Sequence, residues 1–200
     1  PAWTVAPPAA AASAGERVRI AIAQDAAFGF YYGEDLDELA AANVELVPFD
    51  ALADAALPEA DGLVIGGGFP EMFMDALSDN ASLRADIRRK IEAGLPTYAE
   101  CGGLMYLSRS LEYQGQRRDM VGVVPGDTVM HARPVGRGYA RLAPSGDDPW
   151  AERHVIPAHE FHYSSLENLP DTARYAYRVE RGHGIDGTRD GYVAHKLVAA

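Results

Sequence analysis

Residues 61–71 read Asp-Gly-Leu-Val-Ile-Gly-Gly-Gly-Phe-Pro-Glu, and residues 97–104 read Thr-Tyr-Ala-Glu-Cys-Gly-Gly-Leu. In each stretch a short apolar run, 61–65 in the first and 97–99 in the second, is typical of a buried strand and leads into glycines. The second stretch continues into residues 102–111, which we predict to be a helix. Two successive strand–glycine–helix units favour a sheet of parallel strands with helical crossovers.

The same alternation extends over the first 120 residues. Strands are predicted over 17–24 and 44–49, and helices over 33–43 and 82–93, with Ser82 as the N-cap of the second helix. Short links between strands and helices predict an α/β fold with a flavodoxin-like, doubly wound, mostly parallel sheet. After Met120, short strands separated by Pro and Gly predict an antiparallel extension on one edge of that sheet.

Composition limits the classes of function. Pro1–Gly15 is rich in Pro, Ala and Ser without periodicity, which predicts a linker after a preceding domain, and residues 16–200 are expected to form one domain. The net charge of −11 argues against nucleic-acid and anionic-membrane partners. No apolar run is long enough to span a bilayer, and no signal peptide is evident. The single cysteine excludes an internal disulfide and fits a reducing, cytoplasmic setting.

Cys101 is the strongest candidate for chemistry. It stands where a strand ends and a helix begins, followed by two glycines, as in a nucleophile elbow that presents a side chain above a sheet. A helix N-terminus favours the reactive thiolate, and the amide of Gly102 would point toward a developing oxyanion. The alternative is an ordinary buried cysteine with no chemical role.

The Gly66–Gly68 run is the second candidate. It follows a strand at the carboxyl edge of the predicted sheet, where ligands bind in open α/β folds. Glycines there let backbone N–H groups approach a substrate, as an oxyanion hole requires. The alternative is a turn that needs only a positive φ. Phosphate binding is not supported, because no complete phosphate-loop or dinucleotide-binding pattern is present.

Together these motifs resemble the class I glutamine amidotransferases, and within them the cobyrinic (or hydrogenobyrinic) acid a,c-diamide synthases. The resemblance covers nearly all of residues 17–200. It rests on several long motifs in the family's order: 21–32 (AIAQDAAFGFYY), 66–71 (GGGFPE), 98–107 (YAECGGLMYL), 120–126 (MVGVVPG) and 159–164 (HEFHYS).

The resemblance implies a glutaminase domain. In such enzymes the cysteine, here Cys101, attacks the glutamine carboxamide and forms a glutamyl thioester. Gly68 and Gly102 would supply the oxyanion hole, and we expect Gly67 and Glu71 to contact the substrate. The released ammonia would pass to a separate domain that uses ATP and Mg²⁺ to amidate the a and c carboxylates of a corrin ring. No metal or cofactor is expected in residues 16–200. A homodimer and the presence of cobalt in the corrin stay open.

The histidines do not complete the site in the sequence. In the family the catalytic histidine directly follows a stretch similar to Val193–Ala200, so we expect it just beyond Ala200 and assign no base role to His195. His159 and His162 are three apart on a predicted strand and should face opposite ways, which argues against a metal site. The remaining histidines, His131, His154 and His183, are expected to be solvated.

Two other functions remain alternatives to the glutaminase. The first is a catalytically silent interaction module that keeps the elbow. The second is a different cysteine hydrolase on a flavodoxin-like sheet, which would act on an ester or peptide. A histidine shortly after Ala200 would favour the glutaminase over the silent module.

Overall fold

The computed structural model describes residues 17–150 and 153–200; the predicted linker Pro1–Gly15 lies outside them. Its main feature is a nine-stranded sheet in the order β11-β10-β13-β14-β15-β6-β4-β1-β3. Strands β15, β6, β4, β1 and β3 run parallel to their neighbours among these five, and the remaining strands are antiparallel. The predicted parallel sheet with an antiparallel extension is therefore confirmed.

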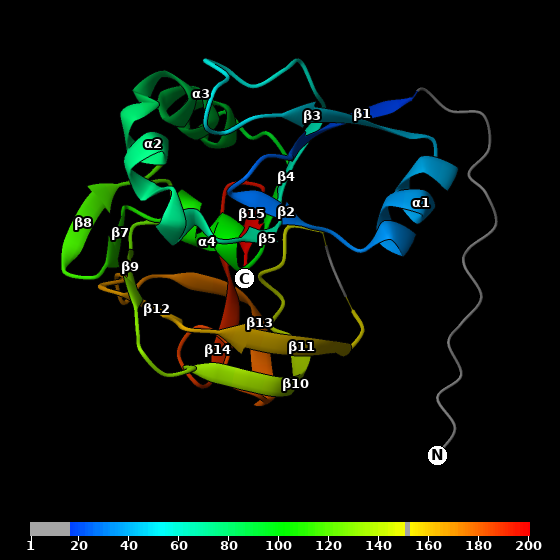
Figure 1. Cartoon of the computed structure of the whole chain (residues 1–200). Coiled ribbons are helices and arrows are strands. Elements are labelled where there is room, and N and C mark those ends of the chain that lie inside the picture. The colour runs from blue at the N-terminus through cyan, green and yellow to red at the C-terminus, as the bar shows by residue number, and fades with distance from the viewer. Residues whose placement is uncertain (1–16, 151–152) are drawn as a thin grey trace.

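The parallel half contains β1 (Val18–Ala23), β3 (Val44–Phe49), β4 (Gly62–Ile65), β6 (Thr97–Ala99) and β15 (Leu197–Ala199). Helix α1 (Gly33–Ala41) lies on one side of these strands, whereas α2 (Met74–Asp79) and α3 (Ala81–Glu92) lie on the other (Figure 1). Short apolar strands covered on both faces are buried, and Ala21, Leu63 and Ile65 are almost completely enclosed. The doubly wound arrangement brings the carboxyl ends of β4 and β6 side by side.

Helix α3 packs on the sheet through one apolar face. Leu83, Ile87 and Ile91 recur at helical spacing and are fully buried. The predicted cap Ser82 is wrong by two residues, because the side chain of Asn80 accepts the hydrogen bond from the Leu83 amide. The Asn80 side chain also donates to the carbonyls of Ala51 and Asp54. Asn80 therefore caps the helix and fixes the loop that contains Ala51 and Asp54 at the same time, which Ser82 does not do.

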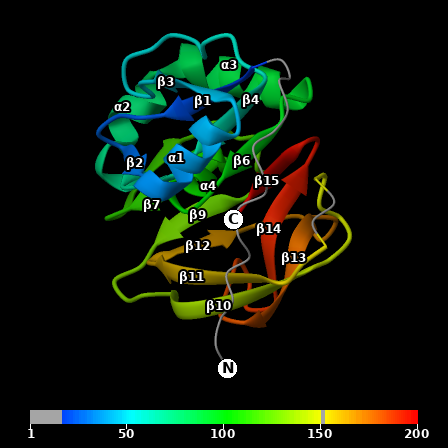
Figure 2. The same cartoon turned by 90° about the vertical axis from the view of Figure 1, so that its right-hand side faces the viewer.

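The antiparallel half extends from β15. It consists of β14 (Arg189–Ala194), β13 (Arg174–Arg181), β10 (Gly136–Pro144) and the edge strand β11 (Ile156–His162). Figure 2 shows the parallel half with its helices above and the strands β10, β11 and β13 below. Because β15 pairs with β6 on one side and β14 on the other, it joins the two halves beside the end of β6.

Two smaller sheets complete the fold. One has the order β12-β9-β7-β8 and contains β7 (Ser110–Tyr113), β8 (Gln116–Asp119), β9 (Asp127–Met130) and β12 (Ser164–Glu167). The other pairs β2 (Phe28–Phe30) with β5 (Gly67–Gly68), ahead of the short 3-10 helix η1 (Pro70–Met72). No helix in the described ranges 17–150 and 153–200 is long and apolar enough to cross a membrane.

Helix α4 (Gly102–Leu107) is shorter than the predicted range 102–111. Ser108 ends it, because its backbone is extended and its hydroxyl lies within hydrogen-bond distance of the carbonyls of Met105 and Ser110. The chain then enters β7. Asp127 anchors this turn through hydrogen bonds from Arg109 and from a set of neighbouring side chains, Ser110, Arg117 and Asn168. The hydrogen bond from Arg109 is the main reason that the pKa of the Asp127 carboxyl lies well below its usual range.

Candidate active site around Cys101

Cys101 occupies a strained turn between β6 and α4. Its φ of 50° and ψ of −107° lie outside the favoured regions of an L-residue. The Cys101 amide donates to the carbonyl of Ala200 at 2.8 Å. A Cβ on Gly103 would lie 2.1 Å from the Ile65 carbonyl oxygen, and one on Gly102 would lie 2.9 Å from the Gly68 nitrogen. Neighbouring backbone therefore excludes side chains at both glycines, and the elbow geometry is present.

The surroundings of the thiol act on its pKa in opposite directions. Cys101 is exposed, yet enough protein encloses the sulfur that burial raises the pKa of the thiol. The carboxylates of Glu100 and Glu71 raise it further, whereas the backbone amides of Gly102 and Gly68 lower it. These two amides belong to the residues predicted to form the oxyanion hole. Their action on the sulfur places both close to the atom that would attack a substrate.

Close backbone contacts explain the glycine run. A Cβ on Gly68 would lie 1.9 Å from the carbonyl oxygen of Ala27, and one on Gly67 would lie 3.3 Å from the Cβ of Phe30. None of Gly66, Gly67 and Gly68 has a positive φ. The alternative that this run is only a turn needing positive φ is therefore wrong, because close packing is what demands glycine here.

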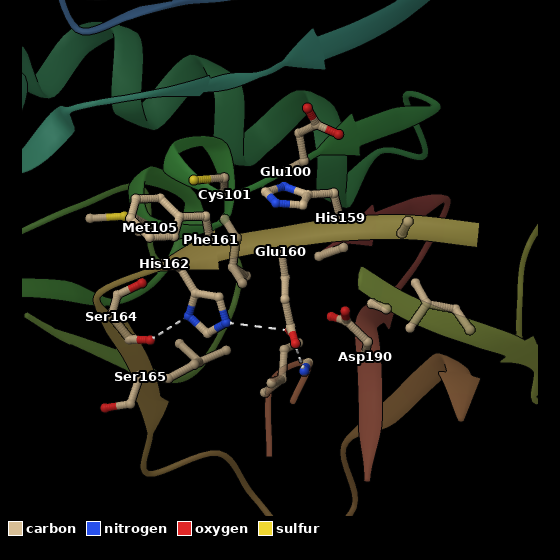
Figure 3. Close-up of a pocket in the computed structure, with 18 of the residues that line it drawn as sticks. Glu100, Cys101, Met105, His159, Glu160, Phe161, His162, Ser164, Ser165 and Asp190 are labelled. Atoms are coloured by element: carbon tan, nitrogen blue, oxygen red, sulfur yellow. Dashed lines mark hydrogen bonds and ion pairs between the residues drawn. The ribbon is translucent and has the colours of Figure 1, made fainter. Parts of the chain in front are cut away.

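A cavity of about 370 Å³ opens beside Cys101, between the two halves of the large sheet. Figure 3 shows Cys101 and Glu100 on one side, with β11 crossing the view and Asp190 beyond it. Ala200, at the end of β15, also lines the cavity. The polar residues of its wall come from several separate elements, and they include Glu100, His159, Glu160, His162, Ser164, Ser165 and Asp190.

Glu160 and His162 are neighbouring wall residues, each held by hydrogen bonds to backbone. The Glu160 carboxylate accepts hydrogen bonds from the amides of His183 and Gly184 at 2.7 and 3.0 Å. The Nε2 atom of His162 lies 3.7 Å from Glu160 Oε2, and its Nδ1 lies 2.9 Å from the Ser164 carbonyl oxygen. Alternation along β11 directs both residues to one face, so the wall has a fixed polar surface.

Asp190 adds a half-buried acid to the same wall. Burial raises the pKa of its carboxyl to about 6, and the amide of Gly191 opposes this shift. Neither Asp190 nor Glu160 was predicted from the sequence to be a site residue. Glu160 belongs to the motif at residues 159–164, which could have indicated it. Asp190 belongs to no motif, and it reaches the cavity wall only because β14 pairs with β13.

The other predicted site residues lie in different surroundings. Glu71, in η1, lines a separate shallow hollow with Met72 and Asp75 and is absent from the wall of the cavity beside Cys101. It is still near enough for its carboxylate to act on the thiol. Burial raises the pKa of Glu71 itself. Contact of Glu71 and Gly67 with a substrate stays a prediction.

The direction of His159 and the exposure of His131 and His154 agree with the sequence prediction, whereas His183 differs from it. His159 projects to the opposite side of β11 from His162, as expected (Figure 3). Within residues 17–150 and 153–200, no group of three metal-ligating side chains could hold an ion. His131 and His154 are exposed, but His183 is half-buried, with its ring 6.1 Å from that of His162. The expectation that His183 is solvated is wrong, because Glu160 holds its backbone against the cavity wall.

His195 lies far along the sheet from the elbow. It occupies the turn between β14 and β15 with a φ of 54°. Leu197 pairs with Thr97 and Ala199 with Ala99, so β15 starts level with the start of β6 and ends level with its end. His195 precedes β15, whereas Cys101 follows β6. The two residues therefore stand at opposite ends of neighbouring parallel strands, which argues against His195 as the partner of Cys101.

Residues 19–200 match the family of CobB/CobQ-like glutamine amidotransferase domains. The chain belongs to this family. A glutamine amidotransferase domain of this kind also occurs in curated relatives named cobyrinate a,c-diamide synthase. The protein from Magnetococcus marinus is 46% identical over 199 residues, covering 97% of this chain and 43% of the relative. The protein from Archaeoglobus fulgidus is 46% identical over 175 residues, covering 87% of this chain and 38% of the relative. The chain thus spans less than half of their length.

Solved structures support the fold of this glutamine amidotransferase domain. A putative GMP synthase component from Thermoplasma acidophilum superposes with a TM-score of 0.62 at 17% identity, covering 93% of this chain and 83% of that one. A glutamine amidotransferase from Thermotoga maritima gives 0.60 at 14% identity, covering 92% and 75%. At these identities the likeness concerns the fold alone.

Proposed function

We propose that this domain is the glutaminase of an ATP-dependent cobyrinate or hydrogenobyrinate a,c-diamide synthase. Its ammonia would be used by a separate domain, which binds ATP and Mg²⁺, to amidate the a and c carboxylates of a corrin. The family membership and the names of the relatives support the class of reaction. The observation that carries the residue assignment is the strained elbow at Cys101, with the amides of Gly68 and Gly102 beside its sulfur.

The chemistry proposed for Cys101 proceeds in two stages. The thiolate sulfur attacks the carboxamide carbon of glutamine, and the carbonyl oxygen becomes an oxyanion held by the amides of Gly68 and Gly102. The carbon–nitrogen bond then breaks, and the nitrogen takes a proton and leaves as ammonia. Water attacks the resulting glutamyl thioester, the carbon–sulfur bond breaks, and glutamate and the thiol are formed. Both stages use the same oxyanion position.

The raised pKa of the thiol means that the nucleophile needs a proton acceptor. By resemblance this is a histidine just beyond Ala200. The hydrogen bond from the Cys101 amide to the Ala200 carbonyl supports the assignment, since it holds this end of β15 against the elbow. His159 lines the same cavity, but within the described parts of the chain no hydrogen bond joins its ring to the Cys101 sulfur.

Histidine replacement in the intact synthase tests this proposal. Replacing the first histidine after Ala200 with Ala should abolish glutamine-dependent amidation and leave amidation with added ammonia unchanged. His195→Ala is the matched control and should retain glutamine use, because His195 stands at the opposite end of β15. Loss of glutamine use in the control alone would contradict the assignment. Absence of any glutamine hydrolysis in the unmodified synthase would favour the catalytically silent module.

A further inference from the structure

The segment of residues 24–31 lies against the glycine run, and Tyr31 joins the two. The Tyr31 hydroxyl donates to the carbonyl of Ala23 at 2.6 Å and accepts from the amide of Gly66 at 3.0 Å. Its ring covers Gly66 so closely that a Cβ there would lie 2.5 Å from a ring carbon. The hydroxyl therefore connects the end of β1 with the end of β4, at the residue where the glycine run begins.

The same segment holds the glycine run along its whole length. Strand β2 pairs with β5, and the amide of Phe69 donates to the Ala27 carbonyl at 2.9 Å. That carbonyl also occupies the space where a Cβ of Gly68 would stand. The direction of the Gly68 amide toward Cys101 thus depends on where residues 24–31 lie.

Asp25 fixes the other end of this segment. One carboxylate oxygen accepts from the amides of Ala27 and Phe28 at 2.7 and 3.0 Å, and the other accepts from Ala51 at 2.6 Å. Asp25 is half-buried, and its bonds are all to backbone rather than to any cavity residue. Asp25 and Tyr31 therefore hold the two ends of one rigid support under the glycine run.

We infer that Tyr31 is a positioning residue for the proposed oxyanion hole. Through its hydrogen bonds to Ala23 and Gly66 it fixes the path of the glycine run, and so the direction of the Gly68 amide. This inference rests on the proposed function. It gives a role to the motif at residues 21–32, which otherwise has no part in the chemistry. Removing the hydroxyl would leave the elbow itself intact, because the backbone hydrogen bonds of Cys101 are to Ala200 and to Met105 of helix α4.

Tyr31→Phe in the intact synthase tests the inference, since it keeps the ring over Gly66 and removes only the hydroxyl. We expect kcat with glutamine to fall by about tenfold to a hundredfold, with KM changed by less than about threefold, because a misplaced donor weakens the transition state most. Amidation with added ammonia should be unchanged. Tyr106→Phe is the matched control. Tyr106 is buried, but within the described residues its hydroxyl has no hydrogen-bond partner, so its loss should not alter glutamine use.

Alkylation of Cys101 separates positioning from general damage to the fold. A chloromethyl ketone derived from glutamine needs the oxyanion hole for its carbonyl oxygen, whereas iodoacetamide needs only an accessible thiolate. Tyr31→Phe should slow the first reaction and leave the second unchanged. If Tyr31→Phe does not fold, Asp25→Asn replaces it, since it loosens the same segment from its other end and should give the same selective loss.

Two results would overturn the inference. One is a kcat for glutamine within about twofold of the unmodified enzyme, which would leave the oxyanion hole independent of the hydroxyl. The other is an equal fall in both alkylation rates, which would indicate general disorder around Cys101. Failure of the unmodified synthase to use glutamine would instead refute the proposed function, so the two failures can be distinguished.

Discussion

Gly68→Ala should damage glutamine use far more than its single added methyl group suggests. The new Cβ would lie 1.9 Å from the Ala27 carbonyl oxygen, whereas ordinary contact begins near 3.4 Å, so β5 and the neighbouring loop must separate by about 1.5 Å. A displacement of about 1 Å at a reacting group can cost about 10² in rate, and loss of one oxyanion donor costs about 10²–10³. We therefore expect kcat/KM for glutamine to fall by about 10²–10³, or about 3–4 kcal/mol.

The assay for Gly68→Ala compares glutamine with ammonia as nitrogen donor in the intact synthase, alongside thermal unfolding. Amidation with ammonia should persist, because the added methyl group acts only within the glutaminase domain. Gly33→Ala is the control: its Cβ would meet no atom within 4 Å and its φ is not positive. Near-normal glutamine turnover by a folded Gly68→Ala enzyme would show that the Gly68 amide does not need its present position, contrary to this prediction.

Two further predictions concern acids near the site. Glu71→Gln should shift the pH midpoint of Cys101 alkylation by iodoacetamide downward, because it removes one of the carboxylates that raise the thiol pKa; an unchanged midpoint would show that Glu71 does not act on the sulfur. Asp190→Asn should stabilise the fold at pH 7. The pKa of Asp190 is about 6 in the native state and 3.8 ordinarily, so between pH 3.8 and 6 the native state binds more protons than the unfolded state. The free energy of unfolding therefore falls as pH rises through this range. Above about pH 6 the charged carboxylate costs the native state up to about 3 kcal/mol. Urea unfolding at pH 4 and 7 measures this, and an equal change at both pH values would contradict it.

Local sequence patterns identified the parallel half of the fold and the elbow. Alternating and apolar runs placed β1, β3, β4 and β6 within a residue or so, because buried parallel strands leave a strong signal. The Cys101 turn followed from a strand running into Gly102 and Gly103, where only glycine fits against the backbone of neighbouring strands. Several long motifs in order then indicated the family.

Long-range pairing determines the parts that local patterns did not reveal. Asp190 reaches the cavity only because β14 pairs with β13 and β15, and no spacing in the sequence links it to Cys101. The end of α4 at Leu107 depends on hydrogen bonds of the Ser108 hydroxyl, and the cap of α3 depends on contacts of Asn80 with a distant loop. The role of Tyr31 could not be inferred from its motif, since its two partners belong to the ends of separate strands.

The proposed function depends above all on Cys101 as the nucleophile of a glutaminase that supplies ammonia. The most direct measurement is nitrogen-donor use by the Cys101→Ser variant of the intact synthase. We expect amidation with glutamine to be lost, since the weaker hydroxyl nucleophile cannot form the thioester, whereas amidation with added ammonia continues at the normal rate. Glutamine-dependent amidation by Cys101→Ser at near the normal rate would contradict the proposed function.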